Sequence, residues 1–487
     1  MIHMNRQALL QDIKRRSARL GALLFFFSLM GHALTQPPGP AAPAGFPTRQ
    51  RSSAPHPDPR VLGLQDCIDI GLARSTEVLK GKNNVELAGA LVLNAYGQFL
   101  PDLNAGAGYN YSAGKSMASA TGPYLVNANR SAFNYQLTST LNIFTGHYNT
   151  ASLKAATLGR KSYELTLERA RQQISLDITQ SFLQVVLDRK VVSLEQENWK
   201  TSTDREKQLT ALTEVGRKAL ADLYQQQAQT SRDQSLLIDA QNRLRTDKIL
   251  LLKKLRLDSL EQYEFGEVPI DEQPQTELYG NEQALVNRAL TQRVDLQAFK
   301  LDKEVAEWDI RKFRSGYLPK VFLGAGVFSN GAYFNTLYVN GIYSKPPSQT
   351  GIGDQLTRQI NGSISVNASW AIFDRYYTRS NVAIARIASS NAQIDYENQH
   401  IQIVSEMRQA YGDYTTALQQ IETADKGVIA AEKAYETLNG RYREGAANFI
   451  ELSTAQINLL QARQTKIEAT ISLMLQKKVI DFYLGAN

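Results

Sequence analysis

Cysteine is almost absent from this chain of 487 residues, and histidine is scarce. The single cysteine, Cys67, excludes an intrachain disulfide, and its apolar neighbours predict a small buried residue. Three of the five histidines lie within the first 60 residues, so we expect no histidine cluster that binds a metal. Gly-x-Ser-x-Gly, phosphate-loop and Cys-x-x-Cys motifs are also missing. These absences predict a protein that is not an enzyme and carries no cofactor.

Positive charge is concentrated at the N-terminus. The formal net charge is +7, and residues 1–60 hold eight Arg or Lys against two Asp. The remainder is close to neutral, without the clustered basic face that nucleic-acid binding needs. We therefore expect no nucleic-acid partner.

The N-terminus has the order of a secretory signal peptide: Lys14-Arg15-Arg16, an apolar run from Leu20 to Met30, and a small-residue site ending at Ala33. We expect residues 1–33 to be this signal, although a retained anchor is the alternative. The apolar run is short for a membrane-spanning helix. Residues 34–60 are rich in Pro, Ala and Ser and predict an extended linker.

An internal repeat organises the rest of the chain. A shift of about 229 positions aligns four pairs over more than a hundred residues without a gap: Phe144 with Phe373, Gly216 with Gly445, Leu223 with Leu452, and Gln227 with Gln456. A shift of about 218 positions aligns Leu100-Pro101 with Leu318-Pro319. Repetition of this length predicts two structural copies, at residues 61–260 and 281–487, joined by a connector at 261–280.

Each copy contains two stretches in which apolar and polar residues alternate, which predicts strands at about 102–114, 133–144, 320–329 and 360–373. A loop joins the strands within each copy, Ser/Ala/Gly-rich in the first. The polar face holds Asn, Ser, Thr and Gly, which favours a transmembrane β-barrel with a polar interior over a soluble sheet. Four strands cannot enclose a lumen, and an open edge in lipid leaves backbone groups unpaired. Three copies would close a barrel of about twelve strands.

A very long helix is expected to follow the second strand of each copy. Residues 148–212 lack proline and are rich in good helix formers, which predicts a helix of about 100 Å at 1.5 Å per residue. A heptad seam in the second copy supports this, although Arg189 and Asp425 interrupt the seams. Each helix is expected to reverse at a tip, at about 213–222 and 442–451. The predicted fold class is mainly α with a membrane β-barrel, a duplicated strand-strand-long helical hairpin unit.

These features resemble the TolC-type outer-membrane efflux family. The residues that carry the resemblance are Arg293-Val294-Asp295-Leu296, Leu318-Pro319, Trp370-Ala371-Ile372-Phe373-Asp374, and the turns Val215-Gly216-x5-Asp222-Leu223 and Glu444-Gly445-x5-Glu451-Leu452. The resemblance implies a homotrimer whose 12-stranded barrel, in the outer membrane of a Gram-negative bacterium, continues into an α-helical periplasmic tunnel. The implied partners are outer-membrane lipid, a periplasmic adaptor protein and an inner-membrane transporter of the RND or ABC type.

The resemblance implies a passive duct for efflux of small molecules. An outer-membrane duct for type I protein secretion is the alternative within this class. From a different class, a periplasmic coiled-coil scaffold that forms no channel also fits the long helices.

The resemblance places a gate at the helical tips. Asp222 and Tyr442 match positions that hold the family's tunnel closed, and Glu451 is expected to line the pore mouth. The family's gate arginine is replaced by alanine at position 447, so Arg217 or Arg443 is expected to substitute for it. The alternative for both acidic residues is that they stabilise the first turn of the returning helices.

The turns also predict a docking surface. Leu220, Leu223, Phe449 and Leu452 are expected to be exposed apolar residues that bind a helical hairpin of the adaptor. Packing between hairpins of the trimer is the alternative. Gly216 and Gly445 are expected for backbone geometry, and Phe144 and Phe373 mark the strand-helix junctions.

Overall fold

The computed structural model describes residues 60–119, 123–258, 263–267, 279–344 and 350–485. The expected signal peptide at 1–33, nearly all of the expected linker and most of the connector lie outside these residues. The statements below concern the described residues alone.

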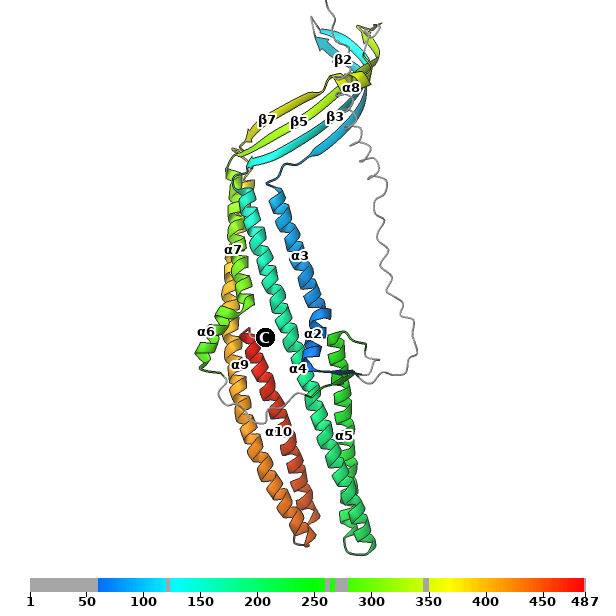
Figure 1. Ribbon diagram of the computed structural model, residues 1–487, viewed down its shortest axis with the longest axis vertical. Coiled ribbons are helices and arrows are strands. Elements are labelled where there is room, and N and C mark those ends of the chain that lie inside the picture. Colours follow the sequence, from blue (N-terminus) through cyan, green and yellow to red (C-terminus); the bar gives the residue numbers. More distant parts are fainter. Residues whose placement is uncertain (1–59, 120–122, 259–262, 268–278, 345–349, 486–487) are drawn as a thin grey trace, which may run out of the picture. The chain divides into compact units, whose positions relative to one another are not determined.

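Four long strands form an antiparallel sheet: β2 (Asn104–Ser119), β3 (Pro123–Phe144), β5 (Lys320–Val339) and β7 (Asn361–Ser369), in the order β2-β3-β5-β7 (Figure 1). A short strand, β6 (Ile342–Tyr343), also pairs with β5. β2 and β3 continue through most of the Ser/Ala/Gly-rich segment that we expected to be a loop. Strand pairing joins backbone groups and needs no alternation of side chains, so the pattern marks only part of each strand.

The two faces of the sheet differ in chemistry. On one face, glycines of β2 and β5 lie opposite polar residues of β3, as in the pairs Gly106 with Gln136 and Gly326 with Thr138. The other face is mainly apolar up to the helix α8 (Ile352–Arg358), which packs on β5 and β3, and Ser139 lies on it opposite Ala325. Every residue of β7 is exposed, and neither β2 nor β7 pairs with a further strand within the described chain.

Two helices of 67 residues follow the sheet, α4 (Tyr148–Glu214) and α9 (Tyr377–Arg443). Both of their ends are related by the shift of about 229 positions found in the sequence. Two successive residues with positive φ precede each helix: Gly146 and His147 in the first copy, Arg375 and Tyr376 in the second. The strands therefore do not run straight into the helices, and β7 ends at residue 369 rather than at 373.

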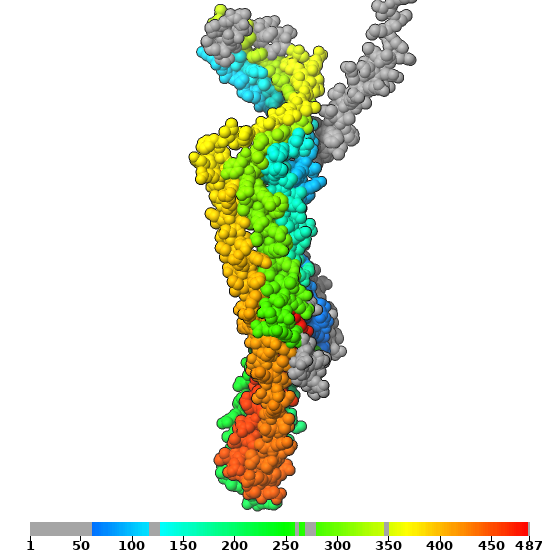
Figure 2. Space-filling model, turned by 90° about the vertical axis from the view of Figure 1, so that its left-hand side faces the viewer, coloured from blue at the N-terminus to red at the C-terminus, as the bar shows by residue number. Residues whose placement is uncertain are grey.

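The remaining helices pack along these two. α5 (Leu220–Leu255) returns along α4, and α10 (Phe449–Tyr483) returns along α9. α3 (Thr76–Gly97) and α7 (Val294–Arg314), preceded by α2 (Leu64–Arg74) and α6 (Glu282–Gln292), cover the parts of α4 and α9 nearer the sheet (Figures 1 and 2). Among the helices described, none combines the length and the apolar run that a membrane crossing needs.

Two apolar clusters hold the helices together. One joins α2, α4 and α5 and contains the fully buried Cys67; the other joins α6, α9 and α10. Beside the first cluster, β1 (Arg60–Leu62) pairs in parallel with β4 (Tyr263–Phe265). Arg189, which interrupts the sequence seam, donates to the carbonyls of Phe265 and Gly266 at 2.6 and 2.8 Å. The arginine that interrupts the apolar seam of the sequence therefore binds the end of β4.

Candidate functional site: the tips of the two helical hairpins

Both helical hairpins reverse through turns with the same hydrogen bonds. Gly216 and Gly445 have φ values of +71° and +77°, and the next N–H in each turn donates to the carbonyl five residues back at 2.8 Å. This is the left-handed glycine ending typical of helices. An added Cβ would meet nothing within 4 Å at either glycine. Backbone conformation alone therefore demands glycine at these turns.

The two returning helices begin differently. Asn448 caps α10 by accepting from the N–H of Glu451 at 2.8 Å, and its amide donates to the Glu451 carboxylate at 3.1 Å. This reciprocal arrangement stabilises the first turn. In the first copy Ala219 stands at the cap, and it has no side-chain acceptor to offer Asp222. Glu451 is exposed, and its carboxylate takes part in the cap.

Three of the four apolar residues that we expected to be exposed are buried within the single chain. Leu223, Phe449 and Leu452 are 8%, 5% and 0% exposed, so the expectation that these residues are exposed is wrong. The reason is contact between hairpins: Leu223 and Phe449 form a cluster with Leu209 of α4. Leu220 is 53% exposed and remains available.

Tyr442 lies against this cluster, beside Phe449. Its hydroxyl is buried without a hydrogen-bond partner among the described residues, and the Lys218 ammonium lies 3.9 Å from the ring centroid. Burial raises the pKa of Tyr442, and the charge of Asp222 raises it further. Asp222 and Tyr442, predicted as a gate pair, are therefore close together within one chain. Arg217 and Arg443 are both exposed.

Sequence reasoning missed a second contact between the hairpins. Arg205 of α4 donates to the side-chain oxygen of Gln456 on α10 and, at 2.8 Å, to the hydroxyl of Tyr435 on α9. The Gln456 amide donates back to Asn198 on α4 at 3.1 Å. These residues adjoin a cavity of about 360 Å³ between the hairpins. The repeat had singled out Gln456, but it gave no partner on the other hairpin.

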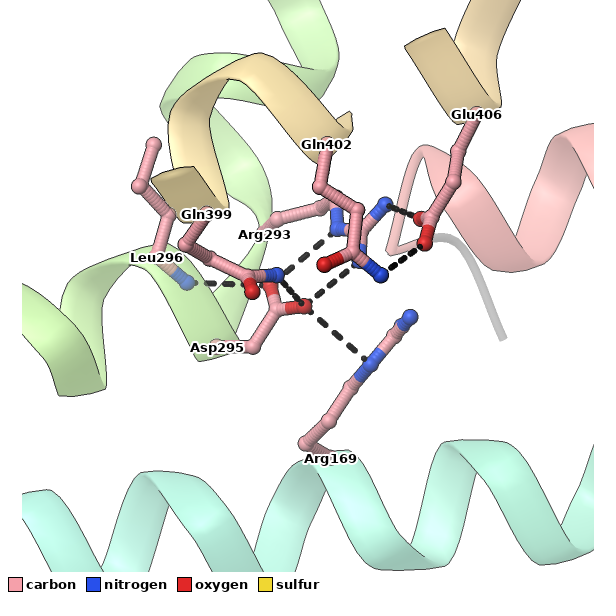
Figure 3. A network of polar contacts seen from close by, with 7 residues as sticks. All are labelled: Arg169, Arg293, Asp295, Leu296, Gln399, Gln402 and Glu406. Atoms are coloured by element: carbon pink, nitrogen blue, oxygen red, sulfur yellow. Dashed lines mark hydrogen bonds and ion pairs between the residues drawn. The ribbon is translucent and has the colours of Figure 1, made fainter. Parts of the chain in front are cut away.

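A charged network further from the tips joins four helices (Figure 3). Arg293, between α6 and α7, binds both oxygens of Asp295 at 3.1 and 2.5 Å, and it binds Glu406 of α9 at 2.6 Å. Arg169 of α4 lies 3.4 Å from Asp295 and stacks on Phe482 near the end of α10. The Arg-x-Asp motif of the sequence thus holds the chain's helices together.

Burial and neighbouring charges shift the pKa values of Asp295 and Arg169 in this network. Burial alone would raise the pKa of Asp295, but the hydrogen bond from Arg293 and the charges of both arginines outweigh it and lower the pKa. Burial lowers the pKa of Arg169, and the charge of Arg293 lowers it further. The arginines and carboxylates of the network are therefore buried together as ion pairs.

The strand-helix junctions share an aromatic contact. Phe144 meets His147 edge to face at 5.4 Å, and Phe373 meets Tyr376 in the same way at 5.5 Å. Among the described residues, no group of three His, Cys, Asp or Glu side chains is placed to hold a metal ion.

Comparison with known proteins identifies the architecture. The model of the family described as "Outer membrane efflux protein" matches residues 68–255 and 285–486. The chain is 22% identical over 415 residues to the outer membrane protein TolC of Escherichia coli K12, covering 84% of this chain and 79% of TolC.

Solved structures show the same fold. The structure of CusC superimposes with a TM-score of 0.74 at 15% identity, covering 87% of this chain and 92% of CusC. The outer membrane protein VceC of Vibrio cholerae superimposes with a TM-score of 0.71 at 16% identity, covering 87% and 96%.

Proposed function

The chain belongs to the outer membrane efflux protein family, and from this premise we propose that three copies form a passive export duct across the outer membrane. The observation that carries the proposal is the open-edged sheet. Ile364 and Val366 of β7 are 81% and 68% exposed in the single chain. Unpaired backbone groups cost several kcal/mol each in lipid, so β7 of one copy pairs with β2 of the next. Threefold closure gives a barrel of about twelve strands.

The apolar face has the height of a membrane. From Val321 to Ser329 the strand β5 rises about 26 Å at ~3.3 Å per residue, near the ~25 Å band of outer-membrane barrels. At the upper end, the hydroxyls of Tyr135 and Ser329 donate to the Leu356 carbonyl at 3.1 and 2.8 Å. Polar side chains thus reappear on this face where the band ends. The opposite face, with its glycines and amides, lines the lumen.

The helices connected to the two edge strands lie at the same boundary between copies. α3 leads into the edge strand β2, and the other edge strand, β7, leads into α9. Both helices carry exposed apolar residues along the parts that extend from the sheet: Leu79, Leu87 and Leu91 on α3, and Ile384, Ile387, Ile394 and Ile401 on α9. Isoleucines at 387, 394 and 401 have the heptad step of helix-helix packing. These two faces cover each other in the trimer, and the helices enclose a tunnel.

The hairpin tips form the inner mouth of this tunnel. Threefold symmetry brings together three copies of Glu451, and Asp222 with Tyr442 holds the mouth closed. Arg217 and Arg443 supply the positive charge that position 447 lacks. Leu220 and the two turns dock a periplasmic adaptor, which connects the duct to an inner-membrane pump of the RND or ABC type. The cargo is small molecules, with type I protein secretion as the second candidate.

Single-channel recording tests the proposal. The purified protein is expected to conduct in planar bilayers, and Glu451→Ala with Asp222→Ala is expected to raise the conductance and weaken block by multivalent cations. Asp69→Ala removes an exposed carboxylate of α2, far from the tips, and is expected to change neither. A monomer without conductance, released from membranes by high salt, would overturn the duct in favour of a scaffold.

A further inference from the structure

The first hairpin has acidic and polar residues along the seam where α4 and α5 face each other. They follow heptad spacing: Asp188, Glu195 and Ser202 on α4, and Gln226, Asp233 and Asp247 on α5, with the buried Ala240 at the heptad position between the last two. The first five are between 0% and 8% exposed. Carboxyl groups are rarely buried in a helical seam without a paired cation.

The second hairpin provides an internal comparison. At the positions related by the shift of 229, it has alanine at 417, 424 and 431 on α9 and at 455 and 462 on α10, and Gln476 corresponds to Asp247. The second seam is thus uncharged where the first is acidic. Shared ancestry of the two hairpins therefore does not account for the acidic seam.

The carboxyl groups of the first seam are unequally satisfied. Asp233 accepts from the Ser202 hydroxyl and, at 2.8 Å, from Gln229. One oxygen of Asp188 accepts from Gln184 at 3.1 Å, and its other oxygen is buried without a donor among the described residues as long as both carboxyl groups are ionised. The neighbouring Asp247 can donate to it only when the pair carries a proton. One oxygen of Glu195 is also buried without a partner among the described residues. Buried oxygens of this kind favour the protonated form.

The register of the hairpin places Asp247 opposite Asp188, because the contacts of Ser202 with Asp233 and of Ser181 with Lys254 lie on either side of this pair. The acidic neighbour favours the protonated form of Asp188. Burial raises its pKa to about 7, the hydrogen bond and charge of Asp247 add to the effect, and Arg243 opposes it. Burial likewise raises the pKa of Glu195, helped by Asp233 and opposed by Arg243. The positive charge of Arg243 thus opposes both shifts without cancelling them.

Cations on the other sides of α4 are already engaged. Arg189 is held by the carbonyls of Phe265 and Gly266 beside β4. Arg463 of α10 pairs with Glu432 at 2.8 Å. These two arginines therefore have partners of their own and do not neutralise the first seam.

We propose that Asp188 and Asp247 share one proton in the seam of the first hairpin, so that acidity sets the stability of α4–α5 but not that of α9–α10. The pair lies within one chain, so the proposal stands independently of the export role. A carboxyl whose pKa is higher in the closed hairpin than in the open one stabilises the closed state at low pH. This stabilisation is lost between about pH 4, the value for an open hairpin, and about pH 7.

Hydrogen exchange of the full-length protein in detergent tests the proposal. Protection of residues 184–202 and 226–247 is expected to fall by up to about tenfold per pH unit between pH 5 and 7, after correction for intrinsic exchange. Residues 413–431 and 455–476 of the second hairpin are expected to show no such fall. Equal pH profiles for the two hairpins would overturn the proposal.

Variants distinguish the effect of the shared proton on the stability of the hairpin from the effect of side-chain packing. Asp188→Asn is expected to flatten the profile of the first hairpin and to raise its protection at pH 7.5 by at least about tenfold. Asp239→Asn, at an exposed position of α5, is expected to leave the profile of the wild type. Asp247→Asn provides the same test if Asp188→Asn does not fold. A folded variant of either pair member that keeps the wild-type profile would refute the shared proton.

Discussion

Replacing Ile364 by lysine tests where lipid meets the sheet. In the register of the sheet, Ile364 pairs with Ala325, which lies midway between Val321 and Ser329 at the two ends of the apolar face. In the proposed barrel, the substituted side chain therefore lies at the midplane of the bilayer. A lysine there costs about 2–4 kcal/mol per chain, or roughly 6–12 kcal/mol for a trimer. We expect Ile364→Lys to abolish stable trimers in membranes.

Ser363→Lys is the matched control. Ser363 precedes Ile364 on the same strand, is also exposed in the single chain, and lies on the polar face opposite Gly326. In the lumen its lysine stays in water, so we expect the trimer to persist. Native gel mass and the urea midpoint of the protein refolded into lipid vesicles measure both effects. Equal losses for the two variants, or none for either, would refute the assignment of the faces.

Further variants address the tips and the charged network. Gly445→Ala is expected to destabilise by about 1–2 kcal/mol because of the positive φ, whereas Gly440→Ala, inside α9 with open space around it, is expected to stabilise by about 0.5–1 kcal/mol in chemical unfolding. Asp295→Ala is expected to cost about 3–5 kcal/mol because Arg169 loses its carboxylate and the buried Arg293 keeps only Glu406, whereas Glu422→Gln in an exposed pair is expected to leave the unfolding midpoint unchanged. Since the pKa of Asp295 is lowered, its contribution is present above about pH 4 and is lost as the pH falls below that value, which unfolding at several pH values measures. Tyr442→Phe removes a hydroxyl that is buried without a hydrogen-bond partner among the described residues and is expected to stabilise the protein by about 1 kcal/mol in chemical unfolding, whereas a loss of stability would show that the hydroxyl is bonded.

The long helices were predictable because their signals are local. The long stretches of helix-forming residues contain no proline, and Gly216 and Gly445, which are related by the shift of about 229 positions, mark the hairpin tips. The two long helices in the structure begin and end at positions related by the same shift. The strands were less predictable at their far ends. Alternation marks only the part of each strand that has one apolar and one polar face, and strand pairing continues beyond it, as between Ser119 and Pro123.

Contacts between the hairpins were not predictable from either tip alone. Leu223 and Phe449 are about 226 positions apart, and each looks like an exposed residue beside a turn. Only the fold brings them together with Leu209. The acidic seam, in contrast, was visible in the repeat, because position-by-position comparison sets Asp188 against Ala417. The turns between strand and helix were not predictable, because the residues with positive φ in the second copy are Arg375 and Tyr376 rather than glycines.

The equal lengths of α4 and α9 restrict how this chain can evolve. Deleting one residue from α4 alone would draw its turn back by about 1.5 Å and rotate it by about 100° relative to α9. Leu209 would then no longer face Phe449, and Arg205 would lose Gln456. Descendants can therefore gain or lose whole heptads only when both helices change together, whereas the loops between paired strands remain free to vary one residue at a time.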